Sequence, residues 1–307
     1  MTHAFGRTRG QSVYRVGGGC HPTYLAHAHA LDRPTWLRRW LRRTPFQRWK
    51  ARLEQRTLTG SQSPHVITNS EMVRDDLSFR YGVSGDRLHV VRNGVDLKRF
   101  RPATELERQR SRESLGLDPE HHAVLFLGSG YARKGLEATL RAAALLATRD
   151  PQLRLLVGGR DKRSDQWRAL ARKLGVADRM HWLGSVARPE ELYWAADCYT
   201  LPTTYDPSAN STLEALASGV PVVTTTMNGA SEILVEGEHG SVITTPVSPH
   251  ELAKAWERWL QRMPDAALAQ SLSAHAGGYP AHASAHAMID VYERVRRDRA
   301  ERTQSTT

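Results

Sequence analysis

The stretch from Tyr205 to Thr226 constrains the fold of this chain more than any other, because it reads in order as a loop, a helix, a tight turn and a strand. Asp206-Pro207 interrupts regular structure, and apolar residues between 213 and 217 recur at helical spacing. Gly219 ends the helix, and the β-branched run 220–226 suits a strand buried in a parallel sheet. The stretch therefore predicts a short helix beside a parallel sheet.

The front of this helix suits an anion flanked by hydroxyl groups. Free backbone N–H groups and the positive end of the helix dipole attract phosphate. The residues concerned are Ser208, Ala209, Asn210 and Ser211, three of which are also good N-cap types. Carboxylates accept hydrogen bonds from sugar hydroxyls, and Asp206 and Glu214 stand on either side of the helix start. A ligand with hexose, diphosphate and ribose in line, which is a nucleotide sugar, fits this order.

A simpler interpretation of the same residues is a capping box. In that motif a serine begins the helix, and a glutamate three residues later closes the first turn. Ser211-Thr-Leu-Glu214 has this spacing, and the pattern is common. This stretch alone supports a cap and a ligand role about equally.

The composition indicates a globular chain with an excess of positive charge. The 307 residues suffice for two domains, and 43 Lys and Arg against 32 Asp and Glu give a formal net charge of +11, which favours anionic partners. No stretch approaches ~18 apolar residues and no signal peptide is evident, so we expect a cytoplasmic protein. Cys20 and Cys198 lie far apart, which predicts reduced thiols; we expect no metal and no cofactor.

Strand and helix patterns alternate along most of the chain, which predicts an α/β fold with doubly wound parallel sheets. The expected strands cover residues 12–16, 65–70, 123–128, 153–158, 179–184, 198–202, 220–226 and 240–244, with a further strand beginning at 88. The expected helices include 136–147, 164–174, 189–196 and 249–262, and residues 264–307 are mostly helical. The charged stretch 103–118 is expected to be a linker.

Two cations follow the strand expected at 123–128. Arg133 and Lys134 end a loop at the carboxyl end of that strand, where α/β sheets bind their ligands. Two positive charges at such a place suit a diphosphate. A basic pair alone is usually a solvated surface feature. Together with the stretch at 206–214, the pair favours a ligand role.

The most basic segment covers residues 32–56 and leaves three interpretations open. Aromatic and leucine residues recur there at helical spacing among the arginines; these apolar residues are Trp36, Leu37, Trp40, Leu41, Phe46, Trp49 and Leu53. The pattern is typical of an interfacial helix on an anionic membrane, and equally of a surface helix packed on its own domain. Nucleic acid is the weakest candidate partner, since no motif for it is present, and we expect none.

The residues from Asp206 onward resemble the signature of the retaining glycosyltransferase family four. In this family an acid and seven residues precede Glu-Ala-Leu-Ala-Ser-Gly-Val-Pro-Val-Val, as they do here, although Asp206 stands where the family usually has the longer glutamate. Val66-Ile-Thr-Asn-Ser-Glu71 and Asn93-Gly-Val-Asp, followed by Phe100-Arg-Pro, resemble the end of the family's first domain. The resemblance covers about residues 12–295.

The resemblance implies two Rossmann-like domains of the GT-B type. The first, residues 1–108, would be an incomplete acceptor-side domain, since family members usually carry about 70 to 100 more residues in front. Residues 109–280 would form the donor domain, and the helix and tail 281–307 would cross back onto the first domain.

The resemblance also implies roles for single residues. Arg133 and Lys134 would neutralise the leaving diphosphate, Glu214 would hold the ribose, and Asp206 would hold the sugar. Further donor contacts would come from Ser185, Val186 and Arg160 in loops near the base, and from the helix start at 208–211. His21 is the candidate catalytic residue of the first domain.

Three features resemble bacterial enzymes of the lipopolysaccharide core: Val13-Tyr-Arg-Val-Gly-Gly-Gly-Cys-His21, the basic segment and the loop Arg133-Lys-Gly135. They imply a hexosyltransferase that moves glucose from a nucleotide-diphosphate sugar, with a UDP-sugar favoured, to a lipid-linked saccharide at the cytoplasmic membrane face. The alternative is a non-catalytic protein that binds nucleotide and membrane. A sugar-nucleotide epimerase is a third, weaker hypothesis.

Overall fold

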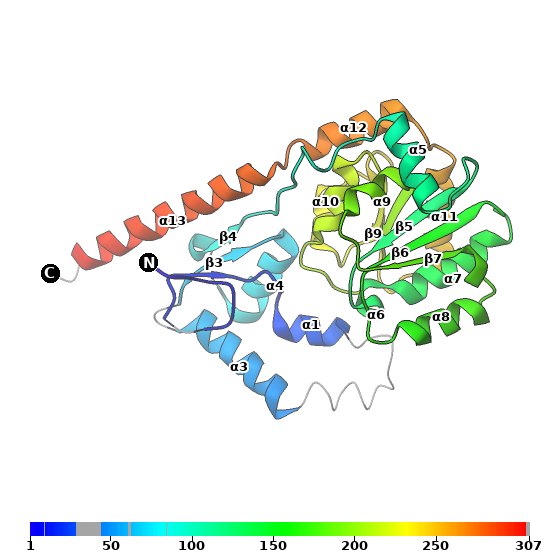
Figure 1. Ribbon diagram of the computed structural model, residues 1–307. Coiled ribbons are helices and arrows are strands. Elements are labelled where there is room, and N and C mark those ends of the chain that lie inside the picture. The colour runs from blue at the N-terminus through cyan, green and yellow to red at the C-terminus, as the bar shows by residue number, and fades with distance from the viewer. Residues whose placement is uncertain (9, 29–43, 61–62, 84, 305–307) are drawn as a thin grey trace. The chain divides into compact units, whose positions relative to one another are not determined.

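The computed structural model describes residues 1–8, 10–28, 44–60, 63–83 and 85–304 (Figure 1). The chain divides into two compact units. Unit 1 comprises Met1–Gly94, Asp206–Ser208 and Ala281–Thr307, and unit 2 comprises Val95–Tyr205 and Ala209–Pro280. The aromatic and arginine residues expected to form a basic helix between 32 and 43 lie outside the described residues.

Unit 2 is built on a six-stranded parallel sheet with the order β10-β9-β8-β5-β6-β7. Its strands are β5 (His122–Leu127), β6 (Leu153–Gly158), β7 (Met180–Gly184), β8 (Cys198–Leu201), β9 (Val222–Thr225) and β10 (Gly240–Ile243). Counted from β5, this is the doubly wound order 3-2-1-4-5-6, whose direction reverses between β5 and β8. Ligands of such sheets bind outside the carboxyl ends of the strands at this reversal.

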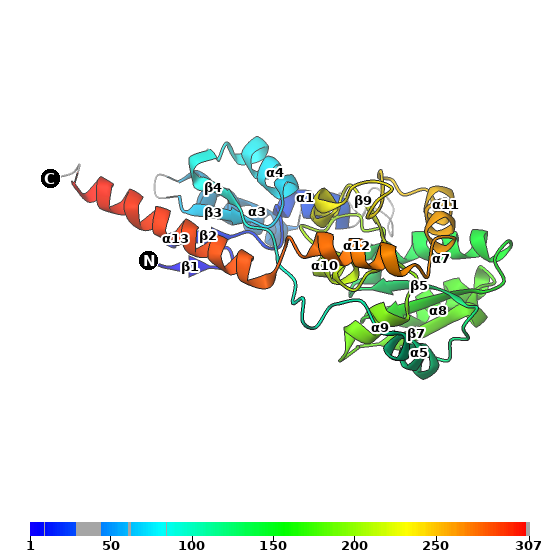
Figure 2. The same ribbon diagram turned by 90° about the horizontal axis from the view of Figure 1, so that it is seen from above.

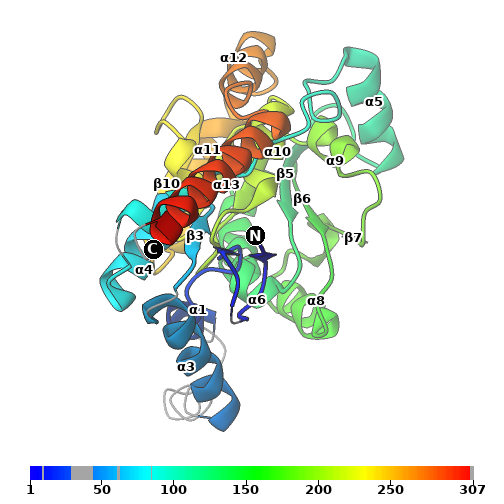
Figure 3. The same cartoon turned by 90° about the vertical axis from the view of Figure 1, so that its left-hand side faces the viewer.

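Two groups of helices enclose this sheet (Figures 1 and 3). The first group is α7 (Leu136–Ala147), α8 (Ser164–Lys173) and α11 (Pro249–Leu260), in which α7 contacts both others. The second is α5 (Glu105–Ser114), α9 (Pro189–Ala195), α10 (Asn210–Ala217) and α12 (Ala266–Ala276). Trp256 and Trp259 of α11 are fully buried, and their indole N–H groups donate to Thr200 and Ser241. The expected α/β class is confirmed.

The prediction of a linker at 103–118 was wrong, because α5 occupies its middle. Thr104 and Glu107 form a capping box at its start. Arg108 and Arg112 then reach Asp197, and Arg112 also donates to backbone carbonyls of Ala195, Asp118 and His121. The helix packs largely through the guanidinium groups of the half-buried Arg108 and the buried Arg112, so it lacks the apolar spacing that identifies a helix in sequence.

Unit 1 contains a four-stranded parallel sheet with the order β1-β2-β3-β4. The strands are β1 (His3–Ala4), β2 (Val13–Arg15), β3 (His65–Thr68) and β4 (Leu88–Val90). Two apolar clusters flank it. One joins the sheet to Leu58 of α3 (Pro45–Thr59) and to Val73 and Leu77 of α4 (Glu71–Tyr81). The helix α1 (His21–Ala28) contacts α3.

The second cluster of unit 1 belongs to the last helix, α13 (Ala281–Gln304), which runs beside the four strands in Figure 2. Val291 and Val295 pack on Val13 and Ile67. His65 also pairs with Asp298 at 3.1 Å. The expected return of the final helix to the first part of the chain is confirmed. No helix among the described residues is both long enough and apolar enough to span a membrane.

The remaining short helices are α6 (Tyr131–Lys134), η1 (Gly85–Arg87), η2 (Ala177–Arg179) and η3 (Gly229–Ile233). The expected strand 153–158 and helix 136–147 match β6 and α7 residue for residue. The loop expected at 129–134 was wrong for its last four residues, where α6 forms a single turn between Gly130 and Gly135.

Candidate functional site

Arg133 and Lys134 lie in α6, directly after β5 and thus at the reversal of the strand order in unit 2. The Lys134 side chain is buried, and its methylene stem passes over Gly128. A Cβ atom at Gly128 would lie 3.4 Å from two carbons of this stem. The lysine stem therefore packs in van der Waals contact with the backbone at the carboxyl end of β5.

The backbone of Arg133 joins α6 to the loop that follows β8. Its carbonyl accepts the N–H of Thr204 at 2.9 Å and the hydroxyl of Thr203 at 3.0 Å. Its guanidinium donates to the carbonyl of Tyr205 at 2.9 Å. The two cations are thus held between the strands β5 and β8.

Gly135 allows this close approach. Its φ of +86° lies in the left-handed region, and a Cβ atom there would stand 2.0 Å from the carbonyl oxygen of Pro202. No other residue fits without moving α6 away from the loop after β8.

The helix α10 begins without a side-chain cap. Ala209 is the N-cap residue, and its N–H donates to Oδ1 of the fully buried Asn228 at 3.1 Å. Asn228 in turn donates to Thr212 and Thr224. The prediction that a serine or Asn210 caps this helix was wrong, because Asn228, from the loop after β9, anchors the helix start instead. Only local spacing was considered in the sequence, so Asn228 was missed.

Glu214 lies in the second turn of α10, and its Oε2 accepts the hydroxyl of Tyr193 at 2.9 Å. Burial raises the pKa of Glu214 above its usual value, and the Tyr193 hydrogen bond opposes that rise. Ser211 is inside the helix, where its Oγ accepts the Tyr199 hydroxyl at 2.6 Å. The capping-box interpretation of Ser211 and Glu214 was therefore wrong.

Three loops meet at the carboxyl edge of the same sheet. The N–H of Gly130 donates to the carbonyl of Arg160, and the N–H of Arg160 donates to Oγ of Ser129. The N–H of Gly159 donates to the carbonyl of Gly184 at 2.6 Å. The Arg160 and Ser185 side chains are exposed, and Val186 is half-buried near Gly158. The expected base-side residues thus share the edge that carries Lys134.

Asp206 and Ser208 group with unit 1 by their contacts. The Asp206 side chain is buried. The carbonyl of Ser208 accepts the amide of Asn93 at 3.4 Å, and Oδ1 of Asn93 accepts the Arg15 guanidinium at 2.9 Å.

His21 is the first residue of α1 and is buried in unit 1. Its N–H donates to Oε1 of Glu54, and its Nε2 lies 2.8 Å from Oε1 of Gln47. Burial, and then the charge of Arg7, lower the pKa of His21, so its imidazole is neutral at neutral pH. The fully buried Glu54 also accepts from Arg7 and Tyr81. This carboxylate was not singled out in the sequence.

Both cysteines are buried thiols, Cys20 in unit 1 and Cys198 in unit 2. Burial raises the pKa of Cys20 to about 12, so the thiol stays protonated at neutral pH. Within the part of the chain that the structure describes, no three His, Cys, Asp or Glu side chains gather closely enough to hold a metal ion.

Two glycosyltransferase family models match the chain, one in each part. The model for glycosyl transferases group 1 matches residues 107–274, and the model for glycosyltransferase family 4 matches residues 3–99. D-inositol 3-phosphate glycosyltransferase of Rhodococcus opacus is 32% identical over 246 residues, covering 76% of this chain and 53% of that protein. Mannosylfructose-phosphate synthase of Agrobacterium fabrum is 29% identical over 201 residues, covering 62% and 44%. The chain spans about half the length of the curated relatives it matches.

Solved structures share the fold at lower sequence identity. WaaG, a glycosyltransferase involved in lipopolysaccharide biosynthesis, superposes with a TM-score of 0.80 at 24% identity, covering 94% of this chain and 76% of WaaG. HepE of Anabaena, solved in complex with UDP-glucose, gives a TM-score of 0.70 at 19% identity, covering 92% and 72%. Both parallel sheets and the two family models agree: this chain belongs to the group 1 glycosyl transferases of family four, with the GT-B fold.

Proposed function

We propose that this chain transfers a hexose, with glucose as the favoured sugar, from a UDP-sugar to a hydroxyl of a lipid-linked saccharide, with retention of the anomeric configuration. Two solved structures support the donor and the acceptor class: WaaG is involved in lipopolysaccharide biosynthesis, and HepE was solved in complex with UDP-glucose. The curated relatives are named for D-inositol 3-phosphate instead. A bacterial lipopolysaccharide core is the acceptor that we favour.

The single observation that carries the proposal is the placement of Arg133 and Lys134 at the reversal of the strand order in unit 2. When a glycosidic bond to a diphosphate breaks, negative charge develops on the departing phosphate. Preorganised cations lower the energy of that state more than that of the bound substrate. We assign this task to Lys134 and Arg133. The start of α10, residues 208–211, would add backbone donors to the same diphosphate.

The remaining donor contacts follow from the chemistry of each side chain. Glu214 would accept hydrogen bonds from the ribose, and Asp206 from hydroxyls of the transferred sugar. The loops with Ser185, Val186 and Arg160 would border the base. We assign no step to a metal ion, because the two cations would themselves take up the charge of the leaving diphosphate.

His21 is the catalytic candidate of unit 1. Its ring is neutral and fixed by Gln47, so it can accept or donate a hydrogen bond at one nitrogen without carrying charge. If it acts on the transferred sugar or on the acceptor, His21→Ala lowers kcat and leaves the affinity for UDP unchanged. A variant that loses UDP affinity as well would instead have lost the packing of α1.

The first test is titration calorimetry with UDP, ADP and GDP. We expect one of them to bind, with UDP favoured, and Lys134→Ala to weaken that binding by roughly tenfold or more through loss of a charge-assisted contact. Lys173→Ala is the matched control, because Lys173 is exposed on α8 and its replacement removes the same charge. Equal losses in the two variants would contradict a specific role of Lys134.

Turnover separates the enzyme from a nucleotide-binding protein without activity. The protein is incubated with UDP-glucose and a lipid-linked core saccharide, and NMR follows the anomeric proton of the product. An α-linked product from the α-linked donor establishes retention. Tight UDP binding without any product, on lipid-linked or soluble acceptors, would favour the non-catalytic alternative.

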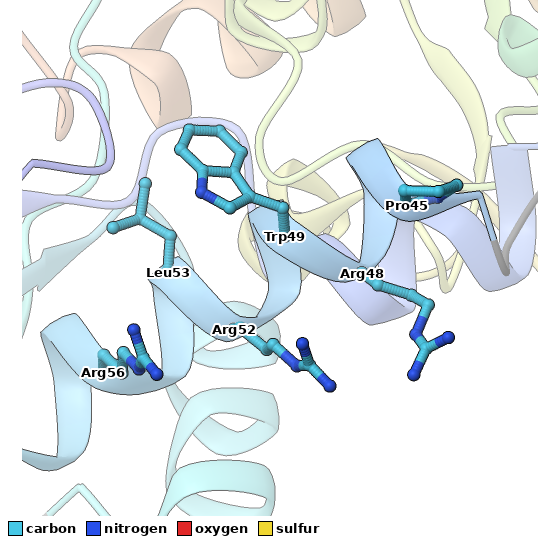
Figure 4. A pocket seen from close by; sticks show the side chains of 6 residues that line it. All are labelled: Pro45, Arg48, Trp49, Arg52, Leu53 and Arg56. Carbon is cyan, nitrogen blue, oxygen red and sulfur yellow. The ribbon is translucent and has the colours of Figure 1, made fainter.

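One surface of unit 1 supports action at a membrane. Arg48, Arg52 and Arg56 of α3 are exposed at four-residue spacing and point to one side of the helix, while Trp49 and Leu53 point to another side (Figure 4). With Pro45 these residues line a pocket of about 470 Å³. Trp49 is 58% exposed, as is Phe46 one turn earlier. We propose that this helix rests on the anionic cytoplasmic face of the inner membrane.

Sedimentation with lipid vesicles tests the membrane proposal. We expect binding to vesicles that contain phosphatidylglycerol and none to pure phosphatidylcholine. Replacing the three arginines of α3 by alanine should weaken the free energy of vesicle binding by about 1 kcal/mol for each arginine. Together this lowers the affinity for the vesicles roughly a hundredfold. The control removes three exposed arginines elsewhere, namely Arg110, Arg168 and Arg172. If both triple variants lose the same affinity, only the net charge matters and α3 is not the docking surface.

A further inference from the structure

Two buried tyrosines contact the residues of α10 that face the proposed donor site. The hydroxyl of Tyr193 in α9 donates to Oε2 of Glu214 at 2.9 Å, and this hydroxyl also lies 3.3 Å from the carbonyl oxygen of Ser211. Tyr199 of β8 lies 2.6 Å from Oγ of Ser211. Neither tyrosine belongs to the signature stretch, and both come earlier in the chain.

The ring of Tyr193 has no freedom to move away from Glu214. It is fully buried, and two other rings meet it edge-on with centroids 5.9 Å away, Phe100 at 75° and Tyr199 at 61°. Such aromatic contacts have preferred geometries and fix the rings that form them. The Tyr193 hydroxyl therefore has a fixed position beside the carboxylate of Glu214, which is half-buried.

Electrostatics make Tyr193 a donor over the whole accessible pH range. Burial raises the pKa of its hydroxyl well above the usual value, and the charge of Glu214 raises it further, so the proton stays on the tyrosine. One carboxylate oxygen of Glu214 is thus occupied. Among the described residues, no hydrogen bond to the other oxygen, Oε1, is present.

We propose that Tyr193 is a positioning residue of the donor site. By holding Oε2 of Glu214, it fixes the carboxylate in one rotamer and leaves Oε1 to accept a ribose hydroxyl of the nucleotide. This inference rests on the proposed function, in which Glu214 contacts the ribose. A freely rotating glutamate would lose side-chain entropy on binding, and a preorganised one does not.

The inference predicts a loss that depends on the ribose. Tyr193→Phe removes the hydroxyl and keeps the ring, so packing in the interior is preserved. We expect its affinity for UDP to fall about fivefold to tenfold, the range of one hydrogen bond. Affinity for 2′,3′-dideoxyuridine diphosphate, which lacks both ribose hydroxyls, should stay the same. A purely structural role of Tyr193 would weaken both ligands alike.

Tyr199→Phe is the matched control. It removes a buried hydroxyl from the neighbouring ring, but that hydroxyl contacts Ser211 and not Glu214. We expect it to change the affinities for UDP and the dideoxy analogue by the same factor. A ribose-dependent loss in both phenylalanine variants would overturn the specific assignment to Tyr193.

Two changes of Glu214 separate this inference from the proposed function. Glu214→Gln should abolish the preference for UDP over the dideoxy analogue; if the preference survives, Glu214 does not hold the ribose and the proposed donor site is wrong at this position. Glu214→Asp keeps the charge but is one methylene shorter, so it cannot reach Tyr193 and the ribose together. If the aspartate variant or Tyr193→Phe keeps the full preference while the glutamine variant loses it, the positioning role is overturned.

The pH dependence gives an independent readout. The Tyr193 hydrogen bond favours the ionised form of Glu214 and holds down a pKa that burial raises. Removing the hydroxyl raises this pKa further, so UDP affinity in Tyr193→Phe should decline at a higher pH than in the wild type. Coincident profiles would contradict the inference.

Discussion

At the residue scale, two side chains from distant parts of the chain anchor α10: Tyr193 contacts its acid Glu214, and Asn228 contacts its N-cap residue Ala209. Asp206 and Glu214 lie within one short motif whose chemistry is visible in the order of residues. Tyr193 and Asn228 act on α10 from 21 and 19 residues away, counted to Glu214 and Ala209. From the sequence alone, a tyrosine in a helix such as Tyr193 is interpreted as a core residue, and an asparagine in a loop such as Asn228 as a turn residue.

Gly135 carries the first prediction at this scale. Gly135→Ala places a methyl group 2.0 Å from the carbonyl of Pro202 at a φ of +86°, so we expect a loss of about 3 kcal/mol or more in the free energy of unfolding. Urea unfolding of unit 2 measures it. Gly175→Ala is the control, since its φ of +71° is similar and no atom lies within 4 Å of the new carbon.

The control should cost only about 1 kcal/mol, which is the strain of a positive φ without a collision. Gly135→Ala should also weaken UDP binding, because α6 must shift and carries Lys134 with it. If the two alanine variants were equally stable, the close packing of α6 on the loop after β8 would be refuted.

At the element scale, apolar periodicity decided what the sequence could reveal. The helix α7 and the strand β6 follow the apolar and β-branched patterns that define such elements, and both were located to the residue. The helix α5 has the charged and polar composition of a linker, because it packs through Arg108 and Arg112 and not through apolar side chains. A pattern method that scores apolar spacing cannot detect a helix whose buried side chains are guanidinium groups.

Arg112 provides the second prediction. It is buried and donates to the Asp197 carboxylate and to the backbone carbonyls of Ala195 and His121. Arg112→Ala leaves the backbone carbonyls without this donor and takes one of two guanidinium partners from Asp197, so we expect a loss of roughly 3 kcal/mol in the stability of unit 2. Arg110→Ala, an exposed change on the same helix, should cost less than about 0.5 kcal/mol. Chemical denaturation of both variants checks the difference.

The contact of α13 with the sheet of unit 1 predicts sensitivity to acid. The His65 and His89 rings stack with their nitrogens 3.1 Å apart, and His65 also pairs with Asp298 of α13. Burial, and then the proximity of His65, lower the pKa of His89 from 6.5 to about 4. Between these two values the unfolded chain binds more protons than the native one, so the stability of unit 1 falls as the pH is lowered through this window.

Replacing His89 by glutamine removes this titration. Between about pH 7.5 and pH 5, we expect unit 1 of His89→Gln to lose about 1 kcal/mol less than the wild type, after allowance for the partial exposure of the ring. His3 and His21 keep part of the acid sensitivity, because burial lowers the pKa of both. His282→Gln, an exposed change on α13, serves as the control for the substitution itself.

At the scale of the whole molecule, each unit has its own apolar interior. The large cluster of unit 2 and the two clusters of unit 1 share no residue. In the sequence, the length allowed two domains and the strand–helix alternation indicated parallel sheets, whereas the two Rossmann-like parts were implied by the family resemblance. The assignment of Asp206–Ser208 to unit 1 could not be predicted from the sequence, because it depends on contacts between segments that are distant along the chain.

Separate interiors predict a localised response to nucleotide. A ligand at a hundred times its Kd stabilises the part that binds it by about 2.7 kcal/mol. The proposed diphosphate and ribose contacts at Arg133, Lys134 and Glu214 all belong to unit 2. Hydrogen exchange with UDP should therefore slow in residues 128–135 and 209–217 and stay unchanged at β2 and β3. Lys134→Ala, compared at the same UDP concentration, should abolish most of the effect. Equal protection of β2 and β3 would mean that unit 1 holds the nucleotide as well, and the donor site would then have to be redrawn to include it.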